Sequence, residues 1–476
     1  MLTPEPNTPD AKRICPDCVG ESFLKKLIQT DGTQDFCSYC DEENPTFSIN
    51  EIADLIERAF EAHYECTPTD PDGYEYAMSS DPDINYEWER FGQAAMWAIY
   101  DAADVNEEIA EDIRAVLEDR HYDHESAKMG EECRFSSDSH YAEKGAGLGE
   151  YLMLWHDFED GLKTKARFFS RSAKSILDRI FVGVSDLPTT EGASVVVTAG
   201  PGTSITMLYR ARVFAGEDDK LKEALKVPWK HLGSPPADAA SAGRMNARGI
   251  AVFYGARDEE TARSEVRPPV GSKVALARFD ILRPLRILDL SALKSVAASG
   301  SIFDPATIER MQRANFLVEL SHLMSRPVMP HEEVSEYLPT QAVADYLANE
   351  IQLDGIIFAS VQTGQESSNV VLFYHASRVE EVELPKGTEV DAYLDMTDSD
   401  GTHPDYWVSE KVPPAAAQVE PSPHRFPFGP LEFQPFDERS DTRAPALRID
   451  HESIQIHHVR AVAFSADAYP VRRNRF

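Results

Sequence analysis

Two C-x-x-C pairs near the start of the chain place the tightest constraint on how it can fold. The pairs are Cys15 with Cys18 and Cys37 with Cys40, and 18 residues separate Cys18 from Cys37. Two such turns can bring four thiolates into a tetrahedron, which suits Zn2+ because this ion accepts soft sulfur ligands. The spacing therefore predicts a zinc-binding unit over residues 1–45. Four cysteines leave no open coordination position, so we expect a structural metal; four unliganded thiols are the alternative.

Composition indicates a large protein of several folded domains. The chain has 476 residues, of which 42 % are hydrophobic and 27 % are charged, as in ordinary globular proteins. Six cysteines are too few for a disulfide scaffold, and we expect Cys66 and Cys133 to be ordinary buried thiols. No apolar run approaches the roughly 18 residues of a membrane span, and the N-terminus has no apolar signal segment. We therefore expect a cytoplasmic protein with no membrane partner.

The balance of charge constrains the partners of the chain. Acidic residues number 81 and basic residues 47, which gives a net charge of −34. Such a surface repels phosphate backbones, which argues against nucleic acid as a partner. A few buried arginines can still capture a small anion through forked hydrogen bonds. Otherwise the acidity serves solubility alone.

Residues 46–190 are predicted to form an acidic, mainly α-helical module. Residues 46–140 contain 25 Asp plus Glu against 6 Lys plus Arg. Ser48 and Glu51 have the spacing of a capping box, which predicts a helix from there to about residue 64. Further stretches with helical periodicity cover 88–102, 106–118, 149–165 and 170–181.

A turn-rich stretch at residues 187–192 marks a predicted domain boundary. Beyond it, short strands and helices intermingle, which suits an α+β domain over residues 195–385. Residues 386–446 are rich in proline and polar residues and are predicted to be a linker. Alternating apolar residues then predict a C-terminal β segment, in the form of a hairpin, over residues 447–476. The predicted fold class is thus multidomain: a zinc knuckle, a mainly α-helical module and an α+β domain.

Polar and glycine residues interrupt the apolar strands of the α+β domain in a fixed order. They stand in the segments Leu-Tyr-Arg, Gly-Arg-Met-Asn-Ala-Arg-Gly, Val-Phe-Tyr-Gly-Ala and Gly-Ile-Ile-Phe-Ala-Ser, with a Glu eleven positions after the Tyr of the third segment. The candidate site residues are Arg210, Arg244, Asn246, Tyr254, Glu265, Ser360 and Asn369. Alone, either of the first two arginines would be a surface ion-pair partner, Tyr254 a core aromatic, Glu265 a solvated helix end and Ser360 a strand-end hydroxyl. Their joint order predicts a site.

This order of motifs resembles the RES family. Its members show a Leu-Tyr-Arg-like strand, a Gly-Arg-x-Asn-x-x-Gly loop, Tyr-x-Ala with a later Glu, and Gly-(Ile/Val)-x-(Tyr/Phe)-x-Ser ahead of an Asn. The resemblance spans about residues 205–385. Met245 departs from the pattern, because many members have tryptophan there, and we expect it to alter packing rather than chemistry. More loosely, the helical module resembles the HEPN/RES N-terminal extension. Arg114 and His121 fit the spacing of HEPN ribonucleases, but the surrounding acidity favours two ordinary surface residues.

The resemblance to the RES family implies a fold similar to that of ADP-ribosyltransferases of the diphtheria-toxin type. It also implies cleavage of NAD+ at the nicotinamide–ribose bond, by phosphorolysis with inorganic phosphate or by hydrolysis. Such domains commonly act as toxins held by a DNA-binding antitoxin, so we expect an antitoxin or another regulatory protein as a partner. Whether the N-terminal module regulates, recruits or forms a homo-oligomer stays open.

Glu265 is the main catalytic candidate. Nicotinamide leaves NAD+ as a neutral group, so the difficulty lies in the positive charge that develops on the ribose. A carboxylate near that ribose stabilises the charge without reorganising. Ser360 can hydrogen-bond the substrate or orient Glu265, and no histidine stands nearby in sequence to activate it as a nucleophile.

The other candidates suit the binding of NAD+. Arg210 and Arg244 can hold the pyrophosphate through forked hydrogen bonds. Tyr254 can present its ring to the cationic nicotinamide, and we count Arg210 and Tyr254 among the catalytic candidates as well. Asn246 and Asn369 are further candidates for contacts with NAD+.

Two other functions remain open. In the first, the ADP-ribose released by the same bond cleavage is transferred to a macromolecule. In the second, the domain binds NAD+ or a protein without catalysis, although the retained Arg, Tyr, Glu and Ser argue against decay of an active site.

Overall fold

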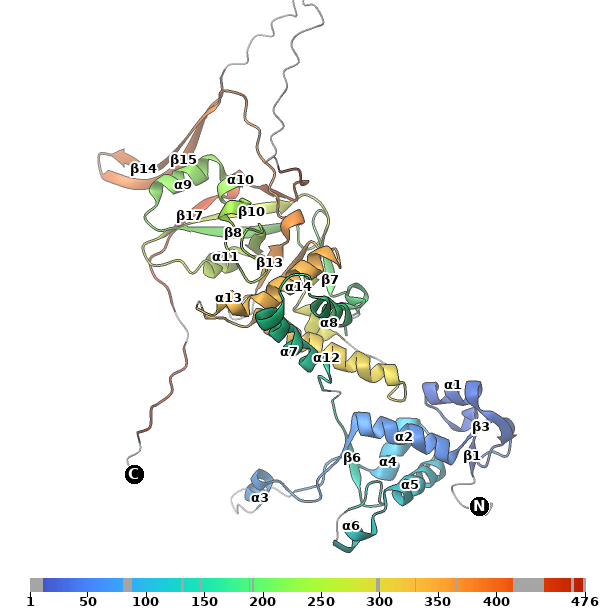
Figure 1. Cartoon of the computed structure of the whole chain (residues 1–476). Helices are drawn as coiled ribbons and strands as arrows, with labels where there is room; N and C mark the ends of the chain where they lie inside the picture. Colours follow the sequence, from blue (N-terminus) through green and yellow to red (C-terminus); the bar gives the residue numbers. More distant parts are fainter. Residues whose placement is uncertain are drawn as a thin grey trace, which may run out of the picture. The chain divides into compact units, whose positions relative to one another are not determined.

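The computed structural model describes most of the chain (Figure 1). The described residues are 12–79, 88–129, 132–145, 147–187, 189–190, 192–296, 300–329, 331–363, 367–413, 441–463 and 466–473. The chain divides into two compact units, the first formed by residues 1–152 with 297–316 and the second by 153–296 with 317–476. Among the described residues, no helix is long and apolar enough to cross a membrane.

The first unit combines two small sheets with several helices. One sheet has the order β1-β3-β2 and contains β1 (Arg13–Ile14), β3 (Glu43–Ser48) and β2 (Thr33–Phe36). The other has the order β4-β6-β5 and contains β4 (Tyr64–Cys66), β6 (His140–Glu143) and β5 (Gln93–Ala94). The helices are α1 (Ser22–Asp31), α2 (Ile49–His63), α3 (Gly73–Ser79), α4 (Ala95–Ala103), α5 (Glu107–His121) and α6 (His124–Met129).

The predicted capping box starts α2. Ser48 Oγ accepts a hydrogen bond from Glu51 N at 3.2 Å, and Glu51 Oε2 accepts one from Ser48 N at 2.7 Å. The apolar face of α2 is buried in one core with α4 and α5. Helices thus dominate this segment, as predicted. The β4-β6-β5 sheet was not predicted, because strands of two to four residues are too short to show an alternating pattern.

Arg114 and His121 are used within the first unit for structural contacts. Arg114 pairs with Glu111 and Glu118 at 2.7 Å each and donates to the carbonyl oxygen of Phe135 at 2.8 Å. His121 Nε2 lies 2.7 Å from Glu57 Oε1. These contacts give the pair an ordinary structural role, but the expectation of two surface residues was wrong for Arg114, which is buried because three acceptors surround its guanidinium; His121 is half-buried.

A nine-stranded sheet organises the second unit (Figure 1). Its order is β16-β10-β8-β9-β13-β12-β11-β7, and β17 also pairs with β10. The ladders are antiparallel except that between β11 and β12. The strands are β7 (Val196–Ala199), β8 (Met207–Phe214), β9 (Phe253–Ala256), β10 (Lys273–Ile281), β11 (Leu285–Asp289), β12 (Gly355–Ala359), β13 (Ser368–Leu372), β16 (Leu447–Ile449) and β17 (Gln455–His458).

Helices cover both faces of this sheet, because side chains alternate along each strand. On β10, Ala275 and Phe279 belong to the same core as Leu221 of α9, whereas Val274 belongs to the core that contains Ala262 of α11. The remaining helices are bounded as follows: α7 (Tyr151–Asp160), α8 (Arg171–Phe181), α9 (Asp218–Lys226), α10 (Pro228–His231), α11 (Glu259–Glu265), α12 (Pro305–Ser325), α13 (Glu333–Glu336) and α14 (Leu338–Asn349). Mixed strands and helices confirm the predicted α+β character.

The C-terminal part differs from the expected linker and hairpin. β14 (Glu389–Asp398) and β15 (Gly401–Lys411) form an antiparallel hairpin inside the segment predicted as a linker. Its strands are fixed by the stacked rings of Tyr393 and Trp407, whose centroids are 4.0 Å apart, and by Leu394, which is buried in the core. The rest of that segment, residues 414–440, lies outside the described part. β16 and β17 do not pair with each other, because each pairs with β10.

Candidate active site

A cavity of about 480 Å3 lies in the second unit, where β8 and β9 diverge. These two strands share a single pair, Tyr209 opposite Ala256, whereas β8 pairs with β10 along its whole length. The predicted site residues that line the cavity are Arg210, Arg244, Tyr254, Glu265 and Asn369. Ser360 and Asn246 are buried and contact lining residues from outside the cavity. The volume is typical of small-molecule sites, which span roughly 300–1,000 Å3.

Glu265 reaches the cavity because it is the last residue of a short helix that starts beside β9. Asp258 caps this helix, α11, through a 2.8 Å hydrogen bond from Thr261 N to Asp258 Oδ1. Arg267 has a φ of 43° and turns the chain away directly after the helix. Glu265 is exposed because it faces the open cavity.

Two buried side chains fix the Glu265 carboxylate. Ser360 Oγ donates to Glu265 Oε1 at 2.6 Å, and Asn369 Nδ2 donates to the same oxygen at 2.7 Å. Ser360 directly follows β12, and Asn369 lies on the adjacent strand β13. Hydrogen bonds to an ionised acceptor are among the strong ones. Glu265 Oε2 has no hydrogen-bond partner among the described residues, so one carboxylate oxygen is held while the other is available to a ligand.

Arg210 forms no ion pair with a carboxylate of the described residues, although it lines this cavity. It lies on β8, its guanidinium stacks over the Phe253 ring at 4.9 Å, and its Nη1 atom is buried with no hydrogen-bond partner in the described structure. Burial, and to a lesser extent the charge of Arg212, lowers the pKa of Arg210 to about 9, so the side chain is still charged at neutral pH. A buried, unpaired charge is unfavourable. The arrangement therefore favours an anionic ligand.

Arg244 supplies a second guanidinium to the same cavity. Its Nη1 atom donates to the carbonyl oxygen of Met324 at 3.2 Å, and the group stacks on the Tyr337 ring at 5.1 Å. Burial lowers the pKa of Arg244, and the nearby Tyr337, Tyr254 and Glu265 partly oppose this shift. Arg244 forms no ion pair with a carboxylate of the described residues, so two cations and one fixed carboxylate share the cavity.

Tyr254 and Asn246 hold the loop of residues 243–249 in shape. The Tyr254 hydroxyl donates to Asn246 Oδ1 and accepts from Met245 N, both at 3.0 Å. Asn246 Nδ2 donates to three nearby backbone carbonyls at 2.9–3.2 Å. A Cβ on Gly243 would lie 2.6 Å from the Tyr254 hydroxyl oxygen, which explains the glycine. Burial raises the pKa of Tyr254, so this hydroxyl stays protonated. The polar atoms of Asn246 are thus engaged by the loop, and its contact with NAD+ stays a prediction.

Residues of α14, and Tyr337 directly before it, also shape the site and are not among the predicted site residues. Thr340 Oγ1 donates to the carbonyl oxygen of Arg244 at 2.6 Å, and Gln341 Nε2 donates to that of Gly243 at 2.8 Å. Tyr337 lines the cavity beneath Arg244. These residues stand roughly a hundred positions after the loop in an ordinary helical sequence, so no local signal marks them. Tyr209, also a lining residue, could have been found from its place beside Arg210.

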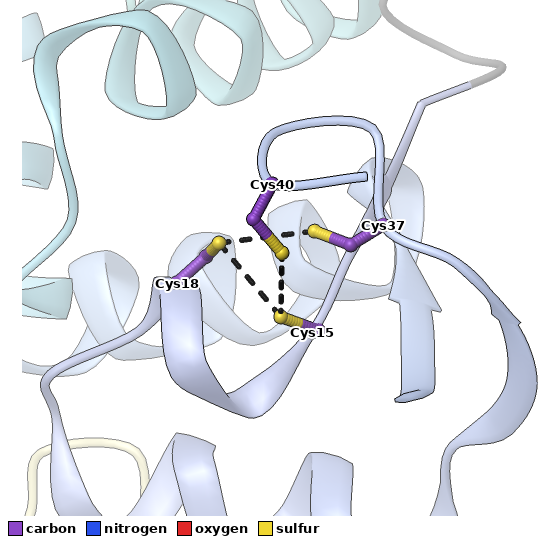
Figure 2. A group of neighbouring side chains, drawn as sticks. All are labelled: Cys15, Cys18, Cys37 and Cys40. Carbon is purple, nitrogen blue, oxygen red and sulfur yellow. Dashed lines mark hydrogen bonds between the residues drawn. The ribbon is translucent and has the colours of Figure 1, made fainter. Parts of the chain in front are cut away.

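The four N-terminal cysteines come together as predicted (Figure 2). Figure 2 shows the sulfur atoms converging, and the Sγ separations are 3.6 Å for Cys15–Cys40, 3.7 Å for Cys15–Cys18 and 3.8 Å for Cys18–Cys37. A tetrahedron of sulfurs about 2.3 Å from a central ion has edges of roughly 3.8 Å. Disulfides need about 2.05 Å. The group can therefore hold a metal ion, and its chemistry fits zinc.

The two remaining cysteines are not both buried, so that prediction was wrong. Cys66 is exposed and Cys133 is half-buried. Cys66 ends the short strand β4, where its Sγ atom lies 3.8 Å from Glu132 Oε2. The end of a strand in a three-stranded sheet offers too little cover to bury a side chain.

The fold and the site together define an α+β domain with a cationic cavity and one fixed carboxylate. Residues 207–395 match the family model of the RES domain, so this chain carries a RES domain, as its ordered motifs predict. Among solved structures, the M. tuberculosis MbcT-MbcA toxin-antitoxin complex contains a similar chain, at 12 % identity over 50 % of this chain and 91 % of that chain, with a TM-score of 0.22. No curated protein matches this chain.

Proposed function

We propose that this chain is an enzyme that consumes NAD+ by cleaving its nicotinamide–ribose bond. One observation carries the proposal: the Glu265 carboxylate, fixed through Oε1, faces the same cavity as the unpaired guanidinium of Arg210. The presence of a RES domain supports NAD+ as the substrate, because the motifs that define the resemblance supply these residues.

The cavity offers a matching group to each part of NAD+. Arg210 and Arg244 would bind the two negative charges of the pyrophosphate, which would also give each of these half-buried cations an ion-pair partner. Tyr254 would present its ring to the cationic nicotinamide, since its hydroxyl is already engaged by the loop. Asn369 would act through Glu265, to which its amide donates.

Glu265 would stabilise the transition state electrostatically. The bond between C1″ of the ribose and N1 of nicotinamide breaks, and its electron pair goes to N1, so that nicotinamide leaves neutral. The fixed carboxylate offsets the positive charge on the ribose without reorganising. An oxygen of water or phosphate then bonds to C1″ and loses its proton to Glu265 or solvent. Water gives ADP-ribose, and phosphate gives ADP-ribose 1″-phosphate.

We propose that Cys15, Cys18, Cys37 and Cys40 hold a structural Zn2+, since their sulfur separations suit tetrahedral coordination. The split between β8 and β9 supports an architecture of the ADP-ribosyltransferase type. An enzyme that depletes NAD+ harms the cell that produces the enzyme, so its activity has to be restrained. This chemistry supports a toxin or defence effector that is held inactive by an antitoxin or another regulatory protein.

The decisive experiment incubates NAD+ with wild-type protein, with Glu265→Gln and with Glu259→Gln. Glu259 is the matched control, because it is an exposed carboxylate on the same helix and does not line the cavity. Products are identified by mass, with and without phosphate. We expect wild type and Glu259→Gln to release nicotinamide with ADP-ribose or its 1″-phosphate. Loss of an electrostatic group of this kind lowers kcat by about 100-fold or more, so Glu265→Gln should fall that far.

Other outcomes separate the alternatives. ADP-ribose found covalently on a macromolecule would replace NAD+ degradation by ADP-ribosyl transfer. Binding of NAD+ without release of nicotinamide, at any phosphate concentration, would show a non-catalytic module. Equal turnover by Glu265→Gln and wild type would remove Glu265 from the mechanism.

A further inference from the structure

A second cavity, of about 990 Å3, borders the first one. Its walls come from α11, from the segment that follows α11, and from residues 457–463, which are the end of β17 and the segment after it. Arg267 and Gln362 line both cavities. The wall formed by residues 457–463 lies outside residues 207–395, so the RES match covers only part of this cavity.

Unpaired arginines distinguish this second cavity. Arg263, Arg267 and Arg460 line it, and none of their side chains forms a hydrogen bond or ion pair with the residues that the structure describes. Among the described residues of the lining, Glu260 is the sole carboxylate. Acidic residues outnumber basic ones by 81 to 47 in the chain, so an arginine readily finds a carboxylate, as Arg90 does with Glu132 at 2.7 Å. Three unpaired arginines in one cavity therefore point to an anionic ligand.

The other walls of the second cavity suit a flat, weakly polar group. Pro268, Pro269 and Val459 add apolar surface to the same lining as the arginines. His457 also lines the cavity, and its Nε2 atom is buried with no partner among the described residues. Burial, together with the charge of Arg263, lowers the pKa of His457, so the imidazole is neutral at pH 7 and offers a hydrogen bond rather than a charge. A nucleobase has the required combination of an apolar face and a polar edge.

We propose that the second cavity binds a nucleotide polyphosphate as a ligand separate from the NAD+ that is cleaved. Arg263, Arg267 and Arg460 bind the phosphates, and the base packs on the proline and valine wall. Because Arg267 belongs to both linings, a nucleotide in this cavity touches the wall of the catalytic cavity. The proposal goes beyond the cleavage of NAD+ and does not depend on it.

The test measures binding to the full chain by calorimetry, with no turnover involved. The probes are ATP, inorganic tripolyphosphate and adenosine, which separate the contribution of phosphate from that of the base. The key variant is Arg263→Gln with Arg460→Gln, since neither arginine lines the catalytic cavity. Arg171→Gln is the control, because Arg171 is an exposed arginine at the start of α8 and lines neither cavity. Arg210→Gln reports binding of the probe in the catalytic cavity.

We expect ATP to bind wild type and Arg171→Gln equally, and to bind the double variant at least about tenfold more weakly, since each lost arginine removes charge-assisted hydrogen bonds. Tripolyphosphate should bind more weakly than ATP, and adenosine weakest. Arg263→Lys with Arg460→Lys should keep part of the affinity, and circular dichroism checks that all variants fold.

Three results would overturn the proposal. The first is that neither ATP nor tripolyphosphate binds, and the second is that the double variant binds ATP as tightly as wild type does. The third is a loss of binding in Arg210→Gln alone, which would place the nucleotide in the catalytic cavity. Tripolyphosphate binding as tightly as ATP would remove the base from the proposal. Since binding is read without turnover, a failure of NAD+ cleavage leaves this test unaffected.

Discussion

Ser360 Oγ donates a 2.6 Å hydrogen bond to Glu265 Oε1, although the two residues are 95 positions apart in the chain. Ser360 is fully buried and does not line the cavity, whereas Glu265 does. The hydroxyl therefore cannot meet a substrate directly without a rearrangement. Its effect on the proposed reaction passes through the carboxylate that it holds, which makes Ser360 a positioning residue.

Replacing Ser360 by Ala should lower kcat about tenfold with little change in KM, because a hydrogen bond to a charged group contributes roughly 1.5–3 kcal/mol. Steady-state kinetics on NAD+ measures this split. Asn369→Ala should act similarly, and the double variant should lose a different amount from the sum, since both donors share one oxygen. A covalent ADP-ribosyl adduct on Ser360, seen by intact mass, would contradict a positioning role.

Tyr254→Phe separates the ring of this residue from its hydroxyl. The change leaves Asn246 Oδ1 and Met245 N without their 3.0 Å partner, so the free energy of unfolding should fall by about 1–3 kcal/mol. The ring remains, so the Kd for NAD+ should rise only a few-fold. Tyr254→Ala should weaken binding much more. Urea unfolding and calorimetry in the Glu265→Gln background measure the two effects, and an unchanged stability would show that the hydroxyl contacts are unimportant.

Arg210→Met should stabilise the folded chain while it weakens the binding of NAD+. Removing a half-buried cation whose Nη1 atom is buried and unpartnered should raise the free energy of unfolding by about 1–3 kcal/mol at pH 7. Burial lowers the pKa of Arg210 to about 9 in the folded state, below its unfolded value. The cost of the cation is therefore fully present below pH 9 and decreases as the pH rises above it, so the difference from wild type should narrow there.

Denaturant unfolding at pH 7 and at pH 10 tests this sign, with Arg171→Met as the control at an exposed position of α8. The Kd for NAD+, measured in the Glu265→Gln background, should rise at least tenfold for Arg210→Met. A loss of stability on removing Arg210 would show that its stacking on Phe253 outweighs the unpaired charge.

The parts of the fold that the sequence predicts are those with local causes. Ser48 and Glu51 cap α2 because a capping box needs only residues three apart. Gly243 could be read as part of a motif for a similar reason, since it packs on Tyr254 only eleven positions away. The four cysteines converge because two short turns suffice to place them.

The parts that escape prediction depend on distant segments. Tyr337 stacks on Arg244 from the turn between α13 and α14, about ninety residues later, and nothing in its own surroundings marks it. The β14–β15 hairpin lies in a segment whose prolines and polar residues suggest a linker, and the Tyr393–Trp407 stack that fixes it is visible only once the strands are paired. The order of the motifs thus identified the catalytic candidates, while their supporting contacts required the three-dimensional structure.

Loss of one cysteine of the N-terminal group should release the metal and destabilise the first compact unit. We expect about one zinc per chain by elemental analysis of protein purified without chelators, and close to none in Cys37→Ser. Cys66→Ser is the control, because Cys66 is exposed and lies outside the group.

In hydrogen exchange, Cys37→Ser should lose protection over residues 12–50, where β1, β2 and β3 surround the cysteines. The strands of the nine-stranded sheet belong to the other compact unit, so their protection should persist. A full zinc content in Cys37→Ser would show that Cys37 is not needed to hold the metal.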